Sequence, residues 1–408
     1  MKLFLYNLIL FVAFTFITEV FSQHLLFTQE EKEEIISYLD SIDYRGAIST
    51  IDEYKISESR AKIEQIFWNI KFAKLDQLNL LRLLFEFNSS LTHSYTLAFI
   101  DSLENLPSFY TGEIPSYLQA MAAGILVLLG DNSKVDLFFN FVDEDSLNST
   151  FSVINLLSEI IEKAPDYEER AKNELIRYVK FSINDNARYS ALMPLYRKYG
   201  TEMLSLMFEV FIEDEEANNR QLVLDQLIKC CKTAQLHTLL KERLWLEPNY
   251  YVRYKIMGKL LGVYGTPEDY KFVFDYLPNE PNPQVKEYRH EDLELYKPPN
   301  PDSSLSIENL INDISNQTDT LYGYSWLGDL NFTNELKNIL TTAKTNLQAR
   351  DSLACRVNVK AFQDSVDFVY QDSLNTDPRF VTIEGWKFLY WNAQYILDRL
   401  PEPPVNPN

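Results

Sequence analysis

The chain has 408 residues, with 59 acidic against 38 basic side chains and a net charge of −21. An acidic surface repels phosphate groups, so the composition argues against a general nucleic-acid binder and against docking on anionic lipid. Hydrophobic residues make up 46% of the chain and glycines number only 11, which favours a folded, mainly helical protein over a disordered chain or a turn-rich β fold.

The first 22 residues have the pattern of a secretory signal peptide. Lys2 supplies the positive start, residues 3–17 form the apolar core, and small or apolar residues lead to a cleavage site before Gln23. A membrane anchor is the alternative, but the apolar run is near the short limit for crossing a bilayer and lacks basic residues on its far side. We therefore expect a secreted or periplasmic protein with no membrane span once residues 1–22 are removed.

Residues 28–112 are also helical in pattern. Thr28 and Glu31 have the spacing of a capping box, with acidic residues in the first turn of the helix that they begin. Further amphipathic segments follow at 59–74 and 78–87. We interpret this region as the atypical first units of a longer helical array, because terminal units have one side facing water.

Three arginines, Arg188, Arg220 and Arg253, mark a recurring layout. Apolar residues stand three, four and seven positions after each arginine, which traces one face of an α-helix. The arginines are 32 and 33 residues apart, and a second amphipathic segment lies between each pair. A period of this length with two helices per unit is typical of an α-solenoid, in which neighbouring helix pairs bury each other's apolar faces.

The ends of these helices are marked less evenly. Gly200 and Gly265 stand twelve positions after the first and third arginines, where a helix would stop in the left-handed conformation. The middle copy has Lys232 in that place, which weakens its stop signal. Upstream the pattern fades but can be followed through origins at Thr150 and Tyr117.

These copies resemble HEAT repeats, because an acidic residue precedes each arginine and a β-branched or small residue follows it by three positions. The resemblance implies a right-handed α-solenoid over 23–277, clearest over 113–277. It also implies that the three arginines are structural braces, which bond acidic groups and carbonyls at the turns between helix pairs, and not substrate ligands. The acidic residues in question are Asp185, Asp214 and Glu247.

Composition changes sharply after Leu277. Residues 278–304 carry six of the seventeen prolines, with Asn and Ser between them. Proline at this density is expected to prevent a continuous helix and to give an extended spacer. We therefore predict a proline-rich linker over 278–304, which separates the solenoid from the C-terminal part of the chain.

A small helical bundle is expected over 305–400, before a proline-rich tail at 401–408. Four amphipathic segments supply it: 306–319, 334–348, 353–373 and 384–400. Their alanine and leucine spacings resemble the FIMAH-type module that is appended to secreted bacterial hydrolases and surface proteins. This resemblance implies an exported bacterial protein with an accessory binding or anchoring role. The matching residues are Leu336, Ala343, Leu347, Ala354, Ala361, Phe362, Val366, Ala393, Ile396, Leu397 and Leu400.

The three cysteines do not form a framework of paired spacings. Cys230 and Cys231 are neighbours on an expected helix, where adjacent side chains diverge by about 100°. We interpret them as packing residues, and a bridge from either one to Cys355 stays open.

The sequence contains no motif that predicts catalysis, a cofactor or a metal site. None of the four histidines stands three or four residues from another, and no nucleophile elbow, phosphate loop or dinucleotide fingerprint occurs. The acidic clusters 143–145 and 213–216 lack the alternating ligands and central glycine of a calcium loop, so we interpret them as solvated turns. We expect no enzyme activity; a hydrolase with a dispersed site is the remote alternative.

The expected function is therefore binding. The leading hypothesis is an exported interaction scaffold that holds a protein partner along the solenoid groove, on the helices that begin at Arg188, Arg220 and Arg253. The alternative is a polysaccharide-binding or wall-associated protein that acts through 305–400. Aromatic side chains at the start of one helix and on the last helix are the candidate binding residues. They are Tyr250, Tyr251, Tyr390 and Trp391.

Overall fold

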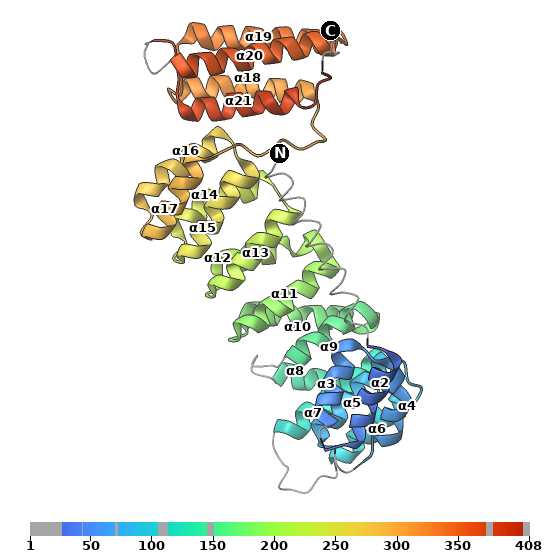
Figure 1. Ribbon diagram of the computed structural model, residues 1–408. Helices are drawn as coiled ribbons and strands as arrows, with labels where there is room; N and C mark the ends of the chain where they lie inside the picture. Colours follow the sequence, from blue (N-terminus) through green and yellow to red (C-terminus); the bar gives the residue numbers. More distant parts are fainter. Residues whose placement is uncertain are drawn as a thin grey trace. The chain divides into compact units, whose positions relative to one another are not determined.

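The computed structural model describes residues 27–42, 44–69, 72–104, 113–144, 151–372 and 378–402 (Figure 1). The predicted signal peptide and residues 403–408 of the predicted tail lie outside this part of the chain. The fold is all-α, as the composition and periodicity predict, and the chain divides into two compact units, Met1–Leu206 and Met207–Asn408. We call them unit 1 and unit 2.

Unit 1 consists of α-helices joined by short turns. Its first helix is capped by Thr28 and Glu31, whose side chains bond each other's backbone N–H groups, so the predicted capping box is confirmed. The helices are α2 Gln29–Ser37, α3 Tyr44–Tyr54, α4 Arg60–Ile66, α5 Lys74–Glu86, α6 Thr92–Glu104, α7 Glu113–Leu128, α8 Val135–Glu144, α9 Phe151–Lys163, α10 Glu168–Phe181 and α11 Asp185–Tyr199, with 3₁₀ turns η1 Tyr38–Asp40, η2 Ser57–Ser59, η4 Pro165–Tyr167 and η5 Gly200–Met203.

The odd-numbered helices of unit 1 form a row. α3 contacts α5, α5 contacts α7, α7 contacts α9 and α9 contacts α11, while α2, α4, α6, α8 and α10 each pack on a neighbour in that row. The helices bury their apolar stripes between the two sets, where Leu81, Phe99, Phe138 and Ile160 are completely inaccessible to solvent.

Unit 2 begins within α12 (Leu204–Glu213), which spans the division. Here α13 contacts α15 and α15 contacts α17, so alternate helices again lie in consecutive contact. The remaining elements are α13 Ala217–Cys230, α14 Ala234–Leu246, α15 Tyr250–Lys259, the π-helical turn η6 Leu260–Tyr264, α16 Pro267–Tyr276, the 3₁₀ turn η7 Leu277–Asn279, α17 Pro283–Glu294, α18 Ile307–Gly323, β1 Leu327–Gly328, α19 Leu330–Gln348, α20 Ser352–Asp372, β2 Phe380–Val381 and α21 Ile383–Leu397.

The last four helices lie side by side in a ring of contacts. α18 and α20 each contact both α19 and α21, and the two-residue strands β1 and β2 pair antiparallel (Figure 1). All four helical segments expected over 305–400 are therefore confirmed. Phe362, Val366 and Leu389 are completely buried, whereas Trp386 is half-buried and Ala361, one of the residues matched to the FIMAH-type pattern, is exposed.

The prediction of an extended spacer over 278–304 is wrong for much of that range. Residues 283–294 form α17, because the prolines stand around the helix and not inside it. Pro283 takes the first helical position, where a missing N–H costs no hydrogen bond, and the Asn282 side chain accepts from the N–H groups of the first turn. Pro298, Pro299 and Pro301 come after the helix has ended.

The remainder of this segment is packed against neighbouring elements of unit 2. Tyr296 is 8% exposed and its hydroxyl donates to the backbone oxygens of Leu261 and Gly265 at 3.1 and 3.2 Å. Lys387 on α21 donates to the Leu293 oxygen at 2.7 Å, and the Tyr395 hydroxyl donates to a proline oxygen at 2.6 Å. The segment is therefore bonded both to η6, which precedes it in the chain, and to α21, which follows it.

The two predicted glycine stops differ in detail. Gly265 has φ 60° and ψ 29°, the left-handed conformation expected at the end of a helix. Gly200 also has positive φ, 55°, but its ψ of −122° lies outside the left-handed region, because the 3₁₀ turn η5 begins at this residue. Within the described residues, no helix combines the length and apolar character needed to cross a bilayer.

Candidate functional site

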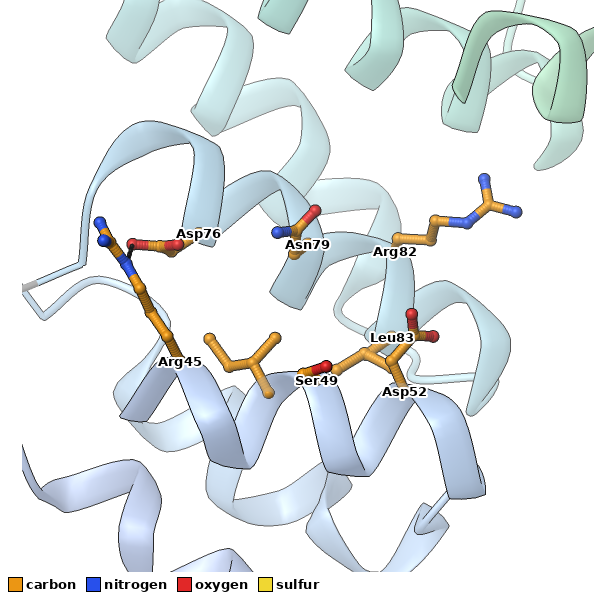
Figure 2. A pocket seen from close by; sticks show the side chains of 8 residues that line it. Arg45, Ser49, Asp52, Asp76, Asn79, Arg82 and Leu83 are labelled. Atoms are coloured by element: carbon orange, nitrogen blue, oxygen red, sulfur yellow. Dashed lines mark hydrogen bonds and ion pairs between the residues drawn. The ribbon is translucent and has the colours of Figure 1, made fainter. Parts of the chain in front are cut away.

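A cavity of about 350 Å³ opens between α3 and α5 in unit 1 (Figure 2). From α3 it is lined by residues at helical offsets of 0, 3, 4 and 7, which share one face of that helix. From α5 the lining again comes from one face. Figure 2 shows an ion pair at one end of the cavity. The lining residues are Arg45, Ile48, Ser49, Asp52, Asp76, Asn79, Arg82 and Leu83.

A second cavity, of about 230 Å³, adjoins the first and extends it over α7 and α9. The two cavities share Asp52, Asn79 and Arg82. We call their combined lining the α3–α9 groove, since it runs over four helices of the row described above. The lining that the second cavity adds is Leu78, Tyr117, Met121, Ile125, Ser152, Asn155 and Leu156.

The floor of the α3–α9 groove is apolar and its charges are matched. Ile48, Leu83, Met121 and other buried aliphatic side chains form the base. Both cations of the lining are ion-paired: Arg45 Nε lies 3.2 Å from Asp76 Oδ2, and Arg82 contacts carboxylates on α5 and α9. With two cationic and two anionic side chains, the lining has no net charge, so it does not favour ligands of either charge.

Uncharged polar side chains complete the lining. Ser49, Asn79, Ser152 and Asn155 are exposed, and their side chains make no hydrogen bond within the described part of the chain. A carboxamide offers an acceptor oxygen and two donor hydrogens, and a hydroxyl offers both roles on one atom. The groove thus presents neutral donors and acceptors above an apolar floor. Apart from helical spacing, nothing in the sequence brings these four residues together.

The three predicted arginines lie near the N-terminal ends of α11, α13 and α15, where they hydrogen-bond to the chain segment that precedes each helix. Arg220 holds Glu247 through Nε and Nη2 at 3.0 and 2.5 Å, and its Nη1 donates to the backbone oxygens of Asp214 and Glu215. Arg253 holds Glu280 in the same way at 2.8 and 2.6 Å. In unit 1, Arg188 donates to the Ser182 oxygen at 2.9 Å. Ser182 stands six residues before Arg188, just as Asp214 stands six residues before Arg220.

Both carboxylates in these turns are buried yet ionised. Burial by itself raises the pKa of Glu247, but hydrogen bonds from Arg220 and from the Asn249 N–H outweigh it and bring the pKa below its ordinary value of 4.5. The pKa of Glu280 is lowered by the same balance between burial and bonds from Arg253 and Asn282. Glu247 therefore joins Arg220 on α13 to the start of α15. Glu280 joins Arg253 on α15 to the start of α17 in the same way.

The arginine–glutamate contact is accompanied by a repeated tripeptide, which the sequence analysis did not identify. Glu-Pro-Asn stands at 247–249 and again at 280–282, 33 residues later, and the asparagine caps α15 in the first case and α17 in the second. Lys286 on α17 takes the position that corresponds to Arg253, and its Nζ donates to the Pro278 oxygen at 3.2 Å. The repeated tripeptide was the available signal that 278–304 contains another helix.

The predicted aromatic residues do not line the α3–α9 groove. Tyr250 and Tyr251 lie in the first turn of α15 and are 51% and 42% exposed. Tyr251 stacks on Tyr254, with ring centroids 6.3 Å apart. No described contact or cavity links these two tyrosines to a binding site.

The predicted pair on α21 lies among other rings. Trp386 stacks on Tyr370 and on Tyr390, with ring centroids 5.3 and 4.8 Å apart. Trp391 has the Lys297 ammonium 3.7 Å above its ring. Tyr390 and Trp391 are half-buried and meet edge to face. These rings stabilise the packing of α20, α21 and the segment after α17.

Titratable side chains form pairs that connect helices. His237 on α14 lies 2.5 Å from Asp269 on α16, and Lys241 contacts the same carboxylate oxygen at 2.7 Å. Asp269 is completely buried and also accepts from the hydroxyl of Thr266, the N-cap of α16, with which it forms a capping box. In the described ranges, no three His, Cys, Asp or Glu side chains are grouped so that they could hold a metal ion.

Comparisons with protein-family models, with curated protein sequences and with solved structures gave no match. The site is therefore interpreted from its own geometry.

Proposed function

We propose that this protein is a non-enzymatic interaction protein, an exported α-solenoid that binds an extended segment of a partner protein in the α3–α9 groove. The observation that carries the proposal is the groove itself, which runs over four helices and combines an apolar floor with unengaged neutral hydrogen-bonding groups. A polypeptide in extended conformation exposes alternating side chains and unpaired backbone N–H and C=O groups, which suit such a lining.

The arrangement of the helices supports the solenoid part of the proposal. Alternate helices are in consecutive contact from α3 to α11 and again from α13 to α17. The paired contacts of Arg220 and Arg253, 33 residues apart, hold corresponding turns in the same geometry. A stack of such pairs resembles HEAT repeats, and α18–α21 would then be a terminal helical module of the FIMAH type.

The matched charges of the groove favour a partner segment with uncharged contact residues. Asn79 on α5 and Asn155 on α9 are exposed carboxamides that can each donate to a backbone C=O and accept from a backbone N–H. Each such neutral hydrogen bond contributes about 1 kcal/mol, so removal of both is expected to weaken binding by about tenfold or more.

The test uses peptides selected for binding to the purified chain from a displayed library of unstructured sequences. Peptides that bind the wild type should lose about tenfold or more in affinity for the Asn79→Ala/Asn155→Ala variant, as measured by calorimetry or fluorescence anisotropy. The matched control is Asn173→Ala on α10, an exposed asparagine outside the groove. All three substitutions raise helix propensity, so the fold is expected to persist.

Selected peptides that bind the double variant as tightly as the wild type would show that the groove is not their site. Failure to select any peptide would count against peptide binding altogether. The alternative, glycan binding through residues 305–400, has less support, because Trp386 stacks on Tyr370 and Tyr390 and the Lys297 ammonium lies over the ring of Trp391. Retention of the chain on an insoluble polysaccharide, with no selected peptide, would favour that alternative.

A further inference from the structure

The turn between α13 and α14 in unit 2 brings two sulfur atoms together. Cys230 is the last residue of α13, and Cys231 follows it with φ −146° and ψ 67°, outside the helical region. The Cys231 thiol donates to Cys230 Sγ at a distance of 2.7 Å. The expectation that these side chains diverge on a helix is therefore wrong, because the helix ends between them.

This turn is built differently from two others in the chain. The turns after α11 and after η6 contain Gly200 and Gly265, both with positive φ, at the positions that Lys232 occupies here. Without a glycine, the chain leaves α13 through Cys231, whose backbone is neither helical nor extended and whose carbonyl accepts from the Thr233 N–H at 2.7 Å. The helical geometry therefore ends at Cys231, and its side chain contacts that of Cys230.

We propose that Cys230 and Cys231 are a modification site, at which they form a disulfide with each other by exchange with a small-molecule disulfide. The Cys230 thiolate attacks one sulfur of the small disulfide and displaces one small thiol, which leaves a mixed disulfide on Cys230. The Cys231 thiolate then attacks Cys230 Sγ and displaces the second small thiol. The two protein thiol protons end on the two released thiols, so one dithiol is oxidised and one disulfide is reduced.

The surroundings of the two thiols set this order. Cys230 is exposed and can meet a small disulfide, whereas Cys231 is 7% exposed. Burial and the contact with Cys230 raise the pKa of Cys231 to about 11, so little of it is thiolate at neutral pH. It therefore reacts only with the sulfur next to it. Adjacent Cα atoms lie about 3.8 Å apart, closer than the roughly 4.4–6.8 Å of ordinary disulfides, so the ring is strained and readily reduced again.

Cys355 does not compete in the folded protein. It lies on α20 with no accessible surface, and burial raises the pKa of its thiol. A small disulfide therefore cannot reach it, and it serves as an internal control for unfolding. An oxidised Cys230–Cys231 ring would fix the end of α13 where the glycine stop is missing.

The experiment treats the reduced full chain with oxidised glutathione, blocks remaining thiols by alkylation and measures peptide masses. A protease that cuts at acidic residues is needed, since Lys229 and Lys232 flank the pair. The expected product is a peptide lighter than the dithiol form by two hydrogen atoms, without glutathione, while Cys355 reacts with the alkylating reagent only after unfolding. Dithiothreitol should restore the two hydrogens.

Two serine variants separate the steps. Cys231→Ser should stop at a stable glutathione adduct on Cys230, and Cys230→Ser should leave Cys231 reduced; circular dichroism checks that both variants are folded. The proposal is overturned if the wild type also stops at the adduct, if both thiols remain open to alkylation, or if either cysteine is found linked to Cys355.

Discussion

At the scale of single residues, the arginine–glutamate pairs of unit 2 depend on the shape of the guanidinium group. Its fork matches both oxygens of a carboxylate, and a third nitrogen remains for the carbonyls of the turn. Arg253 uses all three in this way, with Glu280 on one side and the oxygens of Glu247 and Pro248 on the other. The pair is buried, so neither charge has water as a substitute partner.

We predict that Arg253→Met destabilises unit 2 by about 3–5 kcal/mol, because it leaves the Glu280 carboxylate buried without its counter-ion. The double variant Arg253→Met/Glu280→Met should recover much of this loss, since an apolar pair needs no partner charge. Urea unfolding of the wild type, both single variants and the double variant gives the coupling energy between the two residues.

The matched control is Lys271→Met, which breaks the exposed pair of Lys271 with Asp275 on α16. An exposed ion pair contributes about 0–1 kcal/mol, so this variant should unfold almost as the wild type does. Equal effects of Arg253→Met and Lys271→Met would contradict the buried role of the arginine.

At the scale of elements, α17 shows how proline position outweighs proline content. The prolines between 278 and 301 stand before the helix, at its first position or after its end, so none removes an internal hydrogen bond. After the helix, the chain packs on unit 2: a Cβ on Gly265 would overlap the ring of Pro299. The segment is therefore structured, although its composition is typical of a spacer.

We predict that Asn282→Ala destabilises α17 by about 1 kcal/mol, because it removes the acceptor for two N–H groups of the first turn. Hydrogen exchange of the α17 amides should become faster. Gln284→Ala, at an exposed position in the same turn, is the control and should leave the exchange rates unchanged. If α17 amides exchange at the rate of an unstructured peptide in the wild type, the helix itself is refuted.

At the scale of the whole molecule, acid conditions act on the carboxyl groups of 59 Asp and Glu residues at once. In the part of the chain that the structure describes, Asp76, Glu247, Asp269 and Glu280 are the buried ones. Glu247 and Glu280 have pKa values below 4.5 in the folded chain, so the unfolded state takes up protons first as the pH falls. Their contribution to stability is therefore complete above about pH 4.5 and is lost as the pH falls through their folded pKa values.

We predict that the free energy of unfolding of unit 2 falls progressively below pH 4.5, the ordinary pKa of these groups. Glu280→Gln should be less stable at neutral pH and should lose less stability on acidification, since one of the two titrating groups is absent. Urea unfolding at a series of pH values measures both. Parallel curves for the wild type and Glu280→Gln would show that Glu280 does not titrate as described.

The α3–α9 groove also belongs to this scale, because no single helix contains it. Its polar side chains come from α3, α5 and α9, which are separated by as many as a hundred residues of chain. Their spacing on each helix is visible in the sequence, but helical spacing also describes residues that face solvent or the core. The predicted binding residues were instead aromatic ones, several of which the structure uses for packing.

Apart from α17, most helices could be predicted from the sequence, because a helix depends on contacts only three and four residues apart and on the residues that cap it. The capping box at Thr28 and the four helices over 305–400 could be identified on that basis. The groove, the stacking of Trp386 on Tyr370 and Tyr390, and the contact of Cys230 with Cys231 became visible only in the folded chain. These depend on where helices end and which of them pack together, and such contacts join residues whose sequence separation follows no local period.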